Sequence, residues 1–168
     1  MIYQKTISHN SLPKMAVPLK KAITVQVTGL LKSPPENSKV TLPDPNDMTK
    51  IDVELLGPEG TPYEGGHFHA IITLDADAFP NKPPEVTFTT KIYHPNVDNK
   101  TGSACIPLIL EKEWRPGIKL TKLIQAILEI MKNPIQGHEL DPDIGAEYAL
   151  NRDKFNQTAK QWTQEYAH

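Results

Sequence analysis

Apolar residues recur at helical spacing near the start of the chain. Between Pro18 and Lys32 they fall mostly three or four positions apart and form one stripe, made of Leu19, Ile23, Val27, Leu30 and Leu31. This spacing predicts a helix that docks by one face on the rest of the protein. Many of its other residues are β-branched and lose rotamer freedom in a helix, so we expect packing to stabilise it.

The pattern then changes to short extended stretches, separated by connectors rich in proline and glycine. They predict four strands, at Lys39–Leu42, Lys50–Leu56, Gly66–Leu74 and Glu85–Thr90. In the third stretch apolar and polar residues alternate, which is typical of a sheet with one buried face. Because the connections are short, we expect an antiparallel meander.

Regular patterning is weak over residues 90–120, and Cys105 lies in this long loop. A strongly apolar helical pattern returns at Leu120–Met131 and predicts a central helix. Two further helix starts follow: Asp141-Pro142, as N-cap and first-turn proline, and Asn151, as the N-cap of a last helix. The order of a helix, four strands, a long loop and three helices predicts an α+β fold.

The size and composition of the chain fit one domain. With 168 residues and 38% hydrophobic content, it can bury a core without disulfides or metal sites. We expect a single domain over residues 18–168, preceded by a flexible N-terminal extension, residues 1–17, that shows no periodicity. The formal net charge is −2 and the basic residues are scattered, which argues against nucleic-acid or membrane binding.

The cysteine content indicates the compartment. One cysteine excludes an internal disulfide and a multi-cysteine zinc site, which fits a reducing environment. No segment has the pattern of a secretion signal or of a membrane span. We expect a soluble monomer in the cytoplasm or the nucleus.

Cys105 is the leading candidate for a nucleophile, since a thiolate is a strong nucleophile and a thioester keeps its acyl group activated. The alternative is that a lone cysteine serves as a small buried apolar residue. Its surroundings favour the nucleophile, because Cys105 follows the rigid turn His94-Pro95-Asn96 in a long loop, and long loops inside compact domains are usually functional.

Five sequence blocks occur in a characteristic order. They are Gly57-Pro58 with Thr61–Gly66, Phe79-Pro80 with Pro83-Pro84, Tyr93-His94-Pro95-Asn96, Gly102–Cys105 and Trp114-Arg115-Pro116. In these blocks and their spacing the chain resembles the ubiquitin-conjugating enzyme family, from about Pro18 to His168. The resemblance implies that Cys105 receives ubiquitin from an activating enzyme as a thioester, then transfers it to a lysine of a protein substrate or to a ligase cysteine. The chain has no glycine-rich phosphate-binding loop, so we expect no cofactor and an acyl group that arrives activated.

The resemblance also implies roles for residues near Cys105. Asn96 matches an amide that could stabilise the oxyanion formed when an amine attacks. It could also tie down the active-site loop through backbone hydrogen bonds, and the two roles are compatible. His94, with Tyr93 and Pro95, is expected to be structural rather than catalytic.

A further set of positions matches those that meet activating enzymes and ligases in the family. They are Lys20, Lys21, Pro80, Asn81, Trp114, Arg115 and Pro116. Trp114 and Pro116 could equally belong to the core. His67 and His69 point the same way from a predicted strand, but no third ligand is evident, so we expect a solvated sheet face and no metal.

The chain departs from the family pattern at positions close to the chemistry. Many carriers have an acidic residue two positions after the cysteine and another after the central helix, where carboxylates position or deprotonate an incoming lysine. Here these positions are Pro107 and His138. We therefore predict that discharge to a ligase cysteine is favoured over discharge to free lysine. His138 could still act as a base, because histidine titrates near neutral pH.

Two departures concern the partner-binding positions. Asn81 stands where the ligase-facing loop of the family has a bulky apolar residue, so contacts with HECT-type ligases are less expected. The first helix carries only Lys20, Lys21 and Lys32 where the family is richer in basic residues. We expect weak charging or a requirement for a particular activating enzyme.

Three other interpretations stay open on the sequence alone. The protein could carry another modifier, of the NEDD8 or SUMO type, with the same chemistry. A non-catalytic ubiquitin-binding adaptor of the same fold would typically lack the cysteine, so Cys105 argues against it. A cysteine protease would need a base and an orienting third group beside the thiol, and the sequence indicates neither.

Overall fold

The computed structural model describes residues 16–168. They form α1 (Ala16–Lys32), β1 (Ser38–Thr41), β2 (Lys50–Leu56), β3 (His67–Thr73), β4 (Glu85–Phe88), the 3₁₀ helix η1 (Pro107–Ile109), α2 (Leu120–Lys132), α3 (Pro142–Leu150) and α4 (Arg152–Tyr166). The predicted α+β order is confirmed. Of the expected N-terminal extension, residues 1–15 lie outside the described part of the chain, and α1 begins at Ala16, earlier than the predicted Pro18.

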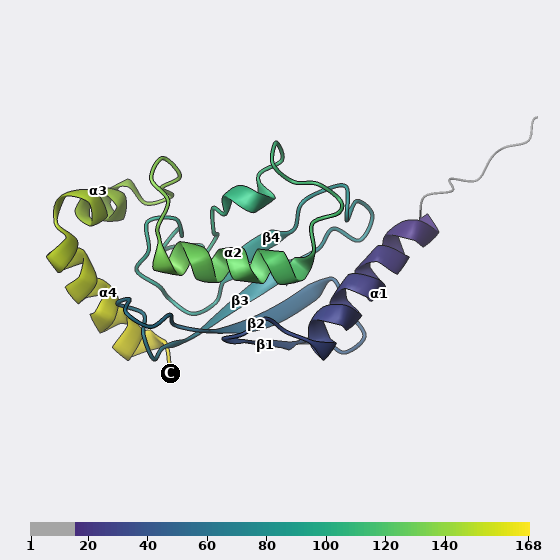
Figure 1. The fold of residues 1–168 in the computed structure, drawn as a ribbon, viewed down its shortest axis with the longest axis horizontal. Coiled ribbons are helices and arrows are strands. Elements are labelled where there is room, and N and C mark those ends of the chain that lie inside the picture. The colour runs from purple at the N-terminus through teal and green to yellow at the C-terminus, as the bar shows by residue number, and fades with distance from the viewer. Residues whose placement is uncertain (1–15) are drawn as a thin grey trace, which may run out of the picture.

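The four strands form an antiparallel meander in the order β1-β2-β3-β4, as predicted. The inner face of the sheet buries alternate residues of β2 and β3: Ile51, Val53, Leu55, Phe68, Ala70 and Ile72. Figure 1 shows α2 lying over the sheet, with α1 and α4 at opposite ends of the molecule. β4 ends at Phe88 rather than Thr90, because the N–H groups of Thr89 and Thr90 both reach the carbonyl of His69 and the ladder stops there.

The central helix α2 provides the middle of the core. The side chains on its inner face are fully buried: Leu120, Leu123, Ile124 and Ile127. Burying each of them contributes about 1.5–3 kcal/mol. α2 therefore has a fixed position, and the loops at both of its ends start from fixed points.

α1 packs on the core through Ile23, Val27 and Leu30, as the spacing predicts. Leu31 is exposed, although the predicted stripe includes it, because it follows Leu30 by one residue and so lies about 100° further around the helix. Gln26 joins α1 to the start of α2. Its amide N–H donates to the Ile118 carbonyl at 3.3 Å, and its amide oxygen accepts the Leu120 N–H at 3.0 Å.

The long loop contains a small hairpin over residues 96–105, which the sequence did not predict. The Cys105 N–H donates to the Asn96 carbonyl at 2.8 Å, and Val97 and Ala104 face each other in an antiparallel bridge. Cys105 thus ends a hydrogen-bonded structure rather than a loose loop.

Gly102 attaches this hairpin to the sheet. Its carbonyl accepts the Phe88 N–H at 2.8 Å, at the end of β4. Its φ of 77° lies in the left-handed region, and a Cβ added there would lie 2.1 Å from the Phe88 carbonyl oxygen. The close approach of the two backbones therefore requires glycine.

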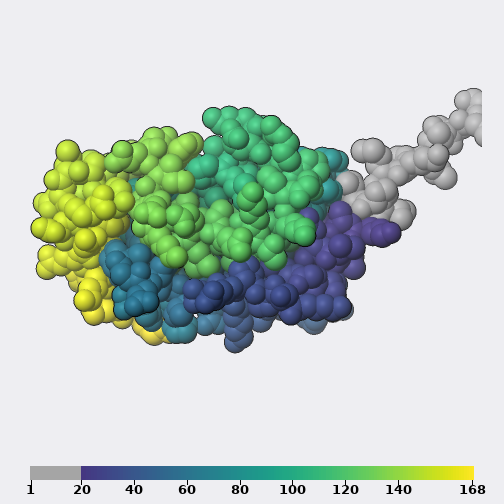
Figure 2. Space-filling view, viewed as in Figure 1, coloured from purple at the N-terminus to yellow at the C-terminus, as the bar shows by residue number. Residues whose placement is uncertain are grey.

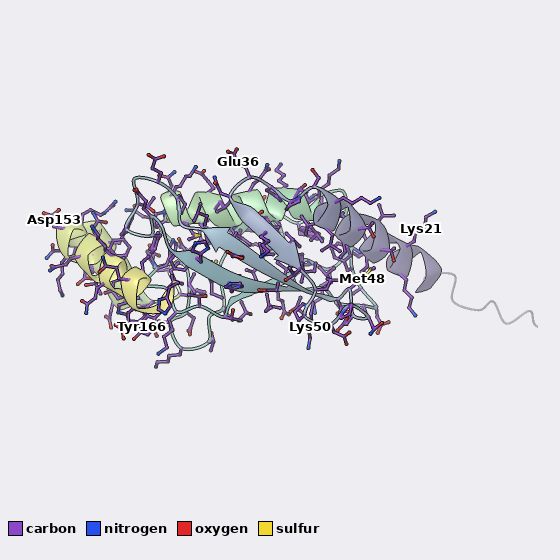
Figure 3. The ribbon with its side chains drawn as sticks, turned by 90° about the horizontal axis from the view of Figure 1, so that it is seen from below. Lys21, Glu36, Met48, Lys50, Asp153 and Tyr166 are labelled. Atoms are coloured by element: carbon purple, nitrogen blue, oxygen red, sulfur yellow. The ribbon has the colours of Figure 1, made fainter. Side chains whose placement is uncertain are left out.

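Figure 3, which views the molecule from below, shows α1 and α4 at opposite ends of the molecule. Lys21 of α1 lies at one end, and Asp153 and Tyr166 of α4 lie at the other. Within residues 16–168, no helix combines the length and the apolar character needed to span a membrane.

Replacing Gly102 by alanine is expected to destabilise the protein more than replacing Gly65. Both residues have φ 77°, where a side chain costs about 1 kcal/mol, but nothing lies within 4 Å of a Cβ added at Gly65. We expect Gly65→Ala to lower the free energy of unfolding by about 1 kcal/mol. Gly102→Ala should lower it by about 1–3 kcal/mol more than that, because the added Cβ meets the Phe88 carbonyl. Urea unfolding measures both, and equal losses would contradict the role of the Phe88 contact.

Candidate functional site

Cys105 lies where the hairpin ends and the chain turns toward η1. Its side chain is half-buried, and burial raises the pKa of the thiol above its usual value. Together with Pro84, Val86 and Ile109 it lines a surface hollow of about 320 Å³. An acyl group attached to the sulfur therefore has space beside it.

The imidazole of His138 lies next to the thiol, with Nδ1 3.8 Å from Sγ. The two residues are 33 positions apart in the sequence, and the fold brings them within reach of an S–H···N hydrogen bond. This contact lets the imidazole accept the thiol proton. His138 also borders a second hollow of about 330 Å³, which Pro107 and Leu108 line as well.

The side chain of Asn96 is fully buried and joins the hairpin to the loop after α2. Its amide oxygen accepts the Ile135 N–H at 2.8 Å. Its amide nitrogen donates to the carbonyls of Ile135 and His138, at 2.7 and 3.0 Å. Both N–H groups of the amide thus donate to this loop, as expected of a side chain that holds the active-site loop through backbone hydrogen bonds. Stabilising an oxyanion would require the release of one of them.

His94 is fully buried, and both of its ring nitrogens have partners. Nδ1 accepts the Asn96 N–H at 3.0 Å, so the proton is on Nε2, which donates to the Ile130 carbonyl at 2.8 Å. Burial lowers the pKa of His94 from 6.5 to about 4, so the ring is neutral at pH 7. This is the environment of a structural residue, with no nitrogen free to act as a base.

Tyr93 and Pro95 connect the same loop to the C-terminal part of the chain. The Tyr93 hydroxyl donates to the Glu147 carboxylate of α3 at 2.8 Å, and the Pro95 carbonyl accepts the Leu140 N–H at 2.9 Å. Burial, and then the bond to Glu147, raise the pKa of Tyr93 to about 12, so the hydroxyl stays protonated and donating. Both residues hold the loop in place.

Asn99 and Asp141 form a contact that the sequence pattern does not predict. The Asn99 amide N–H donates to one carboxylate oxygen of Asp141 at 2.7 Å, while the other oxygen caps α3 by accepting the Ile144 N–H at 3.1 Å. The Asp141-Pro142 signal correctly predicted the cap. Nothing in the sequence pointed to Asn99, because the contact depends on how the hairpin folds against α3.

The residues predicted to meet activating enzymes and ligases lie around α1 and the loop before α2, which Gln26 holds together. The exposed ones are Lys20, Lys21, Asn81, Arg115 and Pro116. Trp114 is buried instead, and its indole N–H donates to the Pro80 carbonyl at 2.7 Å. Trp114 therefore fixes the loop that displays Asn81, and its ring is not part of the exposed surface.

His67 and His69 lie on the outer face of β3 and pair with carboxylates of β2. Nδ1 of His67 is 2.7 Å from Glu54, and Nδ1 of His69 is 3.2 Å from Asp52. In the part of the chain that the structure describes, no three potential metal ligands gather at one point. The two histidines thus take part in cross-strand polar pairs.

Known proteins are similar to this chain in sequence and in fold. The model of a family described as ubiquitin-conjugating enzyme matches residues 22–163. A Dictyostelium discoideum protein named ubiquitin conjugating enzyme E2 B is 37% identical over 147 residues, which cover 88% of this chain and 97% of the relative. The E2 domain of a Toxoplasma gondii ubiquitin conjugating enzyme has a similar structure, with a TM-score of 0.78 and 28% identity, over 88% of this chain and 98% of that one.

His94 is expected to make stability depend on pH. Its pKa is lower in the folded protein, about 4, than the 6.5 of an ordinary histidine, so the unfolded chain binds more protons between these values. The contribution of the neutral ring is therefore complete above pH 6.5 and is lost as the pH falls toward 4. The loss amounts to about 3 kcal/mol in total, of which about 2 kcal/mol is reached by pH 5.

Urea unfolding at pH 7 and pH 5 measures this effect as a difference between variants. His94→Gln removes the titration, so its free energy of unfolding should fall by about 2 kcal/mol less than that of the wild type over this range. His168→Gln, at the exposed C-terminal residue, serves as the control and should keep the wild-type pH dependence. The same pH dependence in His94→Gln and the wild type would contradict a buried neutral ring.

Proposed function

Because this chain belongs to the ubiquitin-conjugating enzyme family, we propose that it carries ubiquitin as a thioester on Cys105. The observation that supports this most directly is the position of the thiol. It ends a hydrogen-bonded hairpin, lines an open hollow and lies 3.8 Å from an imidazole. A cysteine that only filled the core would need none of these features.

In the charging step, the Cys105 sulfur attacks the carbonyl carbon of the ubiquitin C-terminal glycine, which the activating enzyme holds as a thioester. Nδ1 of His138 accepts the thiol proton as the new C–S bond forms. The bond to the sulfur of the activating enzyme then breaks, and that thiolate takes a proton from solvent. Since burial raises the pKa of Cys105, a proton acceptor beside it favours this step.

Ubiquitin is the modifier that we propose, because the names of both relatives refer to ubiquitin. Carriers of the NEDD8 or SUMO type use the same chemistry, so a charging experiment has to compare the modifiers. A reduced thiol is needed throughout, which fits a location in the cytoplasm or the nucleus.

Charged Cys105 is expected to pass ubiquitin to a ligase cysteine more readily than to a free lysine. Pro107 and His138 occupy the positions where carboxylates would position or deprotonate an amine. At pH 7 roughly 3% of cysteine side chains are thiolate, whereas only about 0.04% of lysine ε-amines are neutral, so the ε-amine depends more on such help. When a thiolate attacks, the Cys105 sulfur leaves and takes back the proton from the His138 imidazolium.

The surface around α1 and Asn81 is the one that we assign to activating enzymes and ligases. Lys20 and Lys21 are exposed there, and the buried Trp114 supports the loop that presents Asn81. Asn81 is polar, so we expect weaker binding to HECT-type ligases that depend on an apolar contact at this position.

The charging function predicts an adduct that a reductant removes. The full chain is incubated with ATP and matched sets of activating enzymes and modifiers, and adducts are resolved on non-reducing gels. Cys105→Ser should form an ester that resists reductant but not alkali, and Cys105→Ala should form no adduct. Because Cys105 is the only cysteine, no other thiol can replace it. No adduct with any modifier would reject the carrier function, and an adduct on Cys105→Ala would reject the site.

Selective discharge is tested on charged protein freed of the activating enzyme. With equal concentrations of cysteine and lysine whose α-amines are both acetylated, the wild type should lose its thioester at least about tenfold faster to cysteine. The double variant Pro107→Asp/His138→Asp supplies the missing carboxylates, so its discharge to lysine should accelerate by about tenfold or more.

His168→Asp adds one of these two negative charges at the C-terminal residue, and as the control it should leave both discharge rates unchanged. Rapid discharge of the charged wild type to lysine would refute the proposed preference and leave the carrier function standing. A double variant that charges normally but gains no reactivity with lysine would also refute it.

A further inference from the structure

A basic hollow of about 350 Å³ lies between α4, the end of α2 and the loop that joins β2 to β3. None of its lining residues belongs to the hollows beside Cys105 and His138. Figure 2 shows these three segments side by side on one face of the molecule, where the blue loop meets the yellow α4 and the green α2. The basic hollow is therefore separate from the site of the proposed thioester.

Three basic side chains border this hollow: Lys132 at the end of α2, and Arg152 and Lys160 on α4. Arg152 and Lys160 are eight residues apart with Asn156 midway, so all three lie on one face of α4. The lining includes no Asp or Glu.

The charges of these three residues are uncompensated within residues 16–168, where none of them forms an ion pair. Lys154, on the same helix, shows the contrast, since it pairs with Glu147 at 2.6 Å. The loop from β2 to β3 also carries Glu59 and Glu64, but neither lines the hollow, and the Glu64 carboxylate accepts the Gly60 N–H at 2.8 Å. The hollow is therefore a site of net positive charge.

Arg152 is held in one orientation at the rim. Its guanidinium stacks on the ring of Tyr148, 3.5 Å from the centroid, and its Nε donates to the Tyr148 carbonyl at 3.0 Å. These contacts leave its terminal N–H groups for a carboxylate, which a guanidinium binds through two parallel hydrogen bonds.

The floor of the hollow is apolar. Tyr63, Met131 and Phe155 are buried there, and Pro62 and Pro134 are half-buried beside them. Because these three side chains are buried, the apolar surface that a ligand can cover is that of Pro62 and Pro134. An isolated phosphate or carboxylate would use the charges but leave this apolar surface in contact with water. A ligand that combines negative charge with an apolar group would use both.

We propose that this hollow binds an acidic peptide segment of a partner protein. One apolar side chain of the segment lies on the floor, and the carboxylates on either side of it pair with Arg152, Lys160 and Lys132. The hollow is at the α4 end, opposite the α1 end in Figure 1. A partner bound here would therefore leave the surface around α1 accessible, and the proposal does not depend on the thioester chemistry.

The proposal is tested with a fluorescein-labelled peptide of sequence Asp-Glu-Leu-Asp-Glu, blocked at both ends, and the full chain. Fluorescence anisotropy should show saturable binding that weakens as salt is added. The amide peptide Asn-Gln-Leu-Asn-Gln should bind about tenfold more weakly or worse, because it lacks the charges. The peptide Asp-Glu-Ser-Asp-Glu should also bind more weakly, because it lacks the apolar side chain.

Two charge-matched double variants locate the binding site. Lys132→Gln/Lys160→Gln keeps the Arg152 stack and should weaken binding of the acidic peptide by about tenfold. Lys50→Gln/Lys122→Gln removes the same charge from two exposed lysines outside the hollow and should change binding by less than about twofold. Amide NMR shifts on titration should cluster at Thr61, Tyr148 and Asn156.

Several results would overturn the proposal. They are the absence of binding at the highest soluble peptide concentration, equal binding of the amide peptide, equal losses in the two double variants, or NMR shifts that cluster elsewhere. Equal binding of the serine peptide, or displacement by inorganic phosphate at similar concentration, would show a simple anion site and would also overturn it.

Discussion

The arrangement around Cys105 depends on the buried side-chain amide of Asn96. This amide provides partners for the Ile135 N–H and for the carbonyls of Ile135 and His138. A buried backbone group without a partner costs about 1–3 kcal/mol, so the loop after α2 is held where the amide can satisfy it. Asn96 also starts the hairpin that ends at Cys105. Its side chain therefore fixes the loop that carries His138 relative to the thiol of Cys105.

His94 extends this network into the core. Its neutral ring lies between the Asn96 N–H and the carbonyl of Ile130, near the end of α2. The apolar burial of α2 stabilises the fold, but the hydrophobic effect is not directional and does not orient the reactive groups. The hydrogen bonds from Ile130 through His94 to Asn96 are directional. They therefore fix the position of the reactive groups relative to the packed helix α2.

Local patterns predicted the helices and strands well, because each pattern reports burial within its own segment. β2 was predicted with its observed bounds, Lys50–Leu56, since alternate residues there are buried in one sheet face. The hairpin at residues 96–105 was missed for the opposite reason. It is stabilised by backbone bonds to β4 and by the left-handed φ of Gly102, and neither produces a periodic pattern of apolar residues.

The sequence by itself determined the α+β fold, the single thiol at Cys105 and the helix starts at Asp141 and Asn151, because these depend on residue type and on spacing along the chain. Only the tertiary structure decided that His138 meets the thiol, that the Asn96 amide is engaged with a loop, and that Trp114 faces inward. Those contacts join residues 33 to 42 positions apart. Their distances are set by how α2 and the hairpin pack against the sheet, and such packing leaves no local signature in the order of the residues.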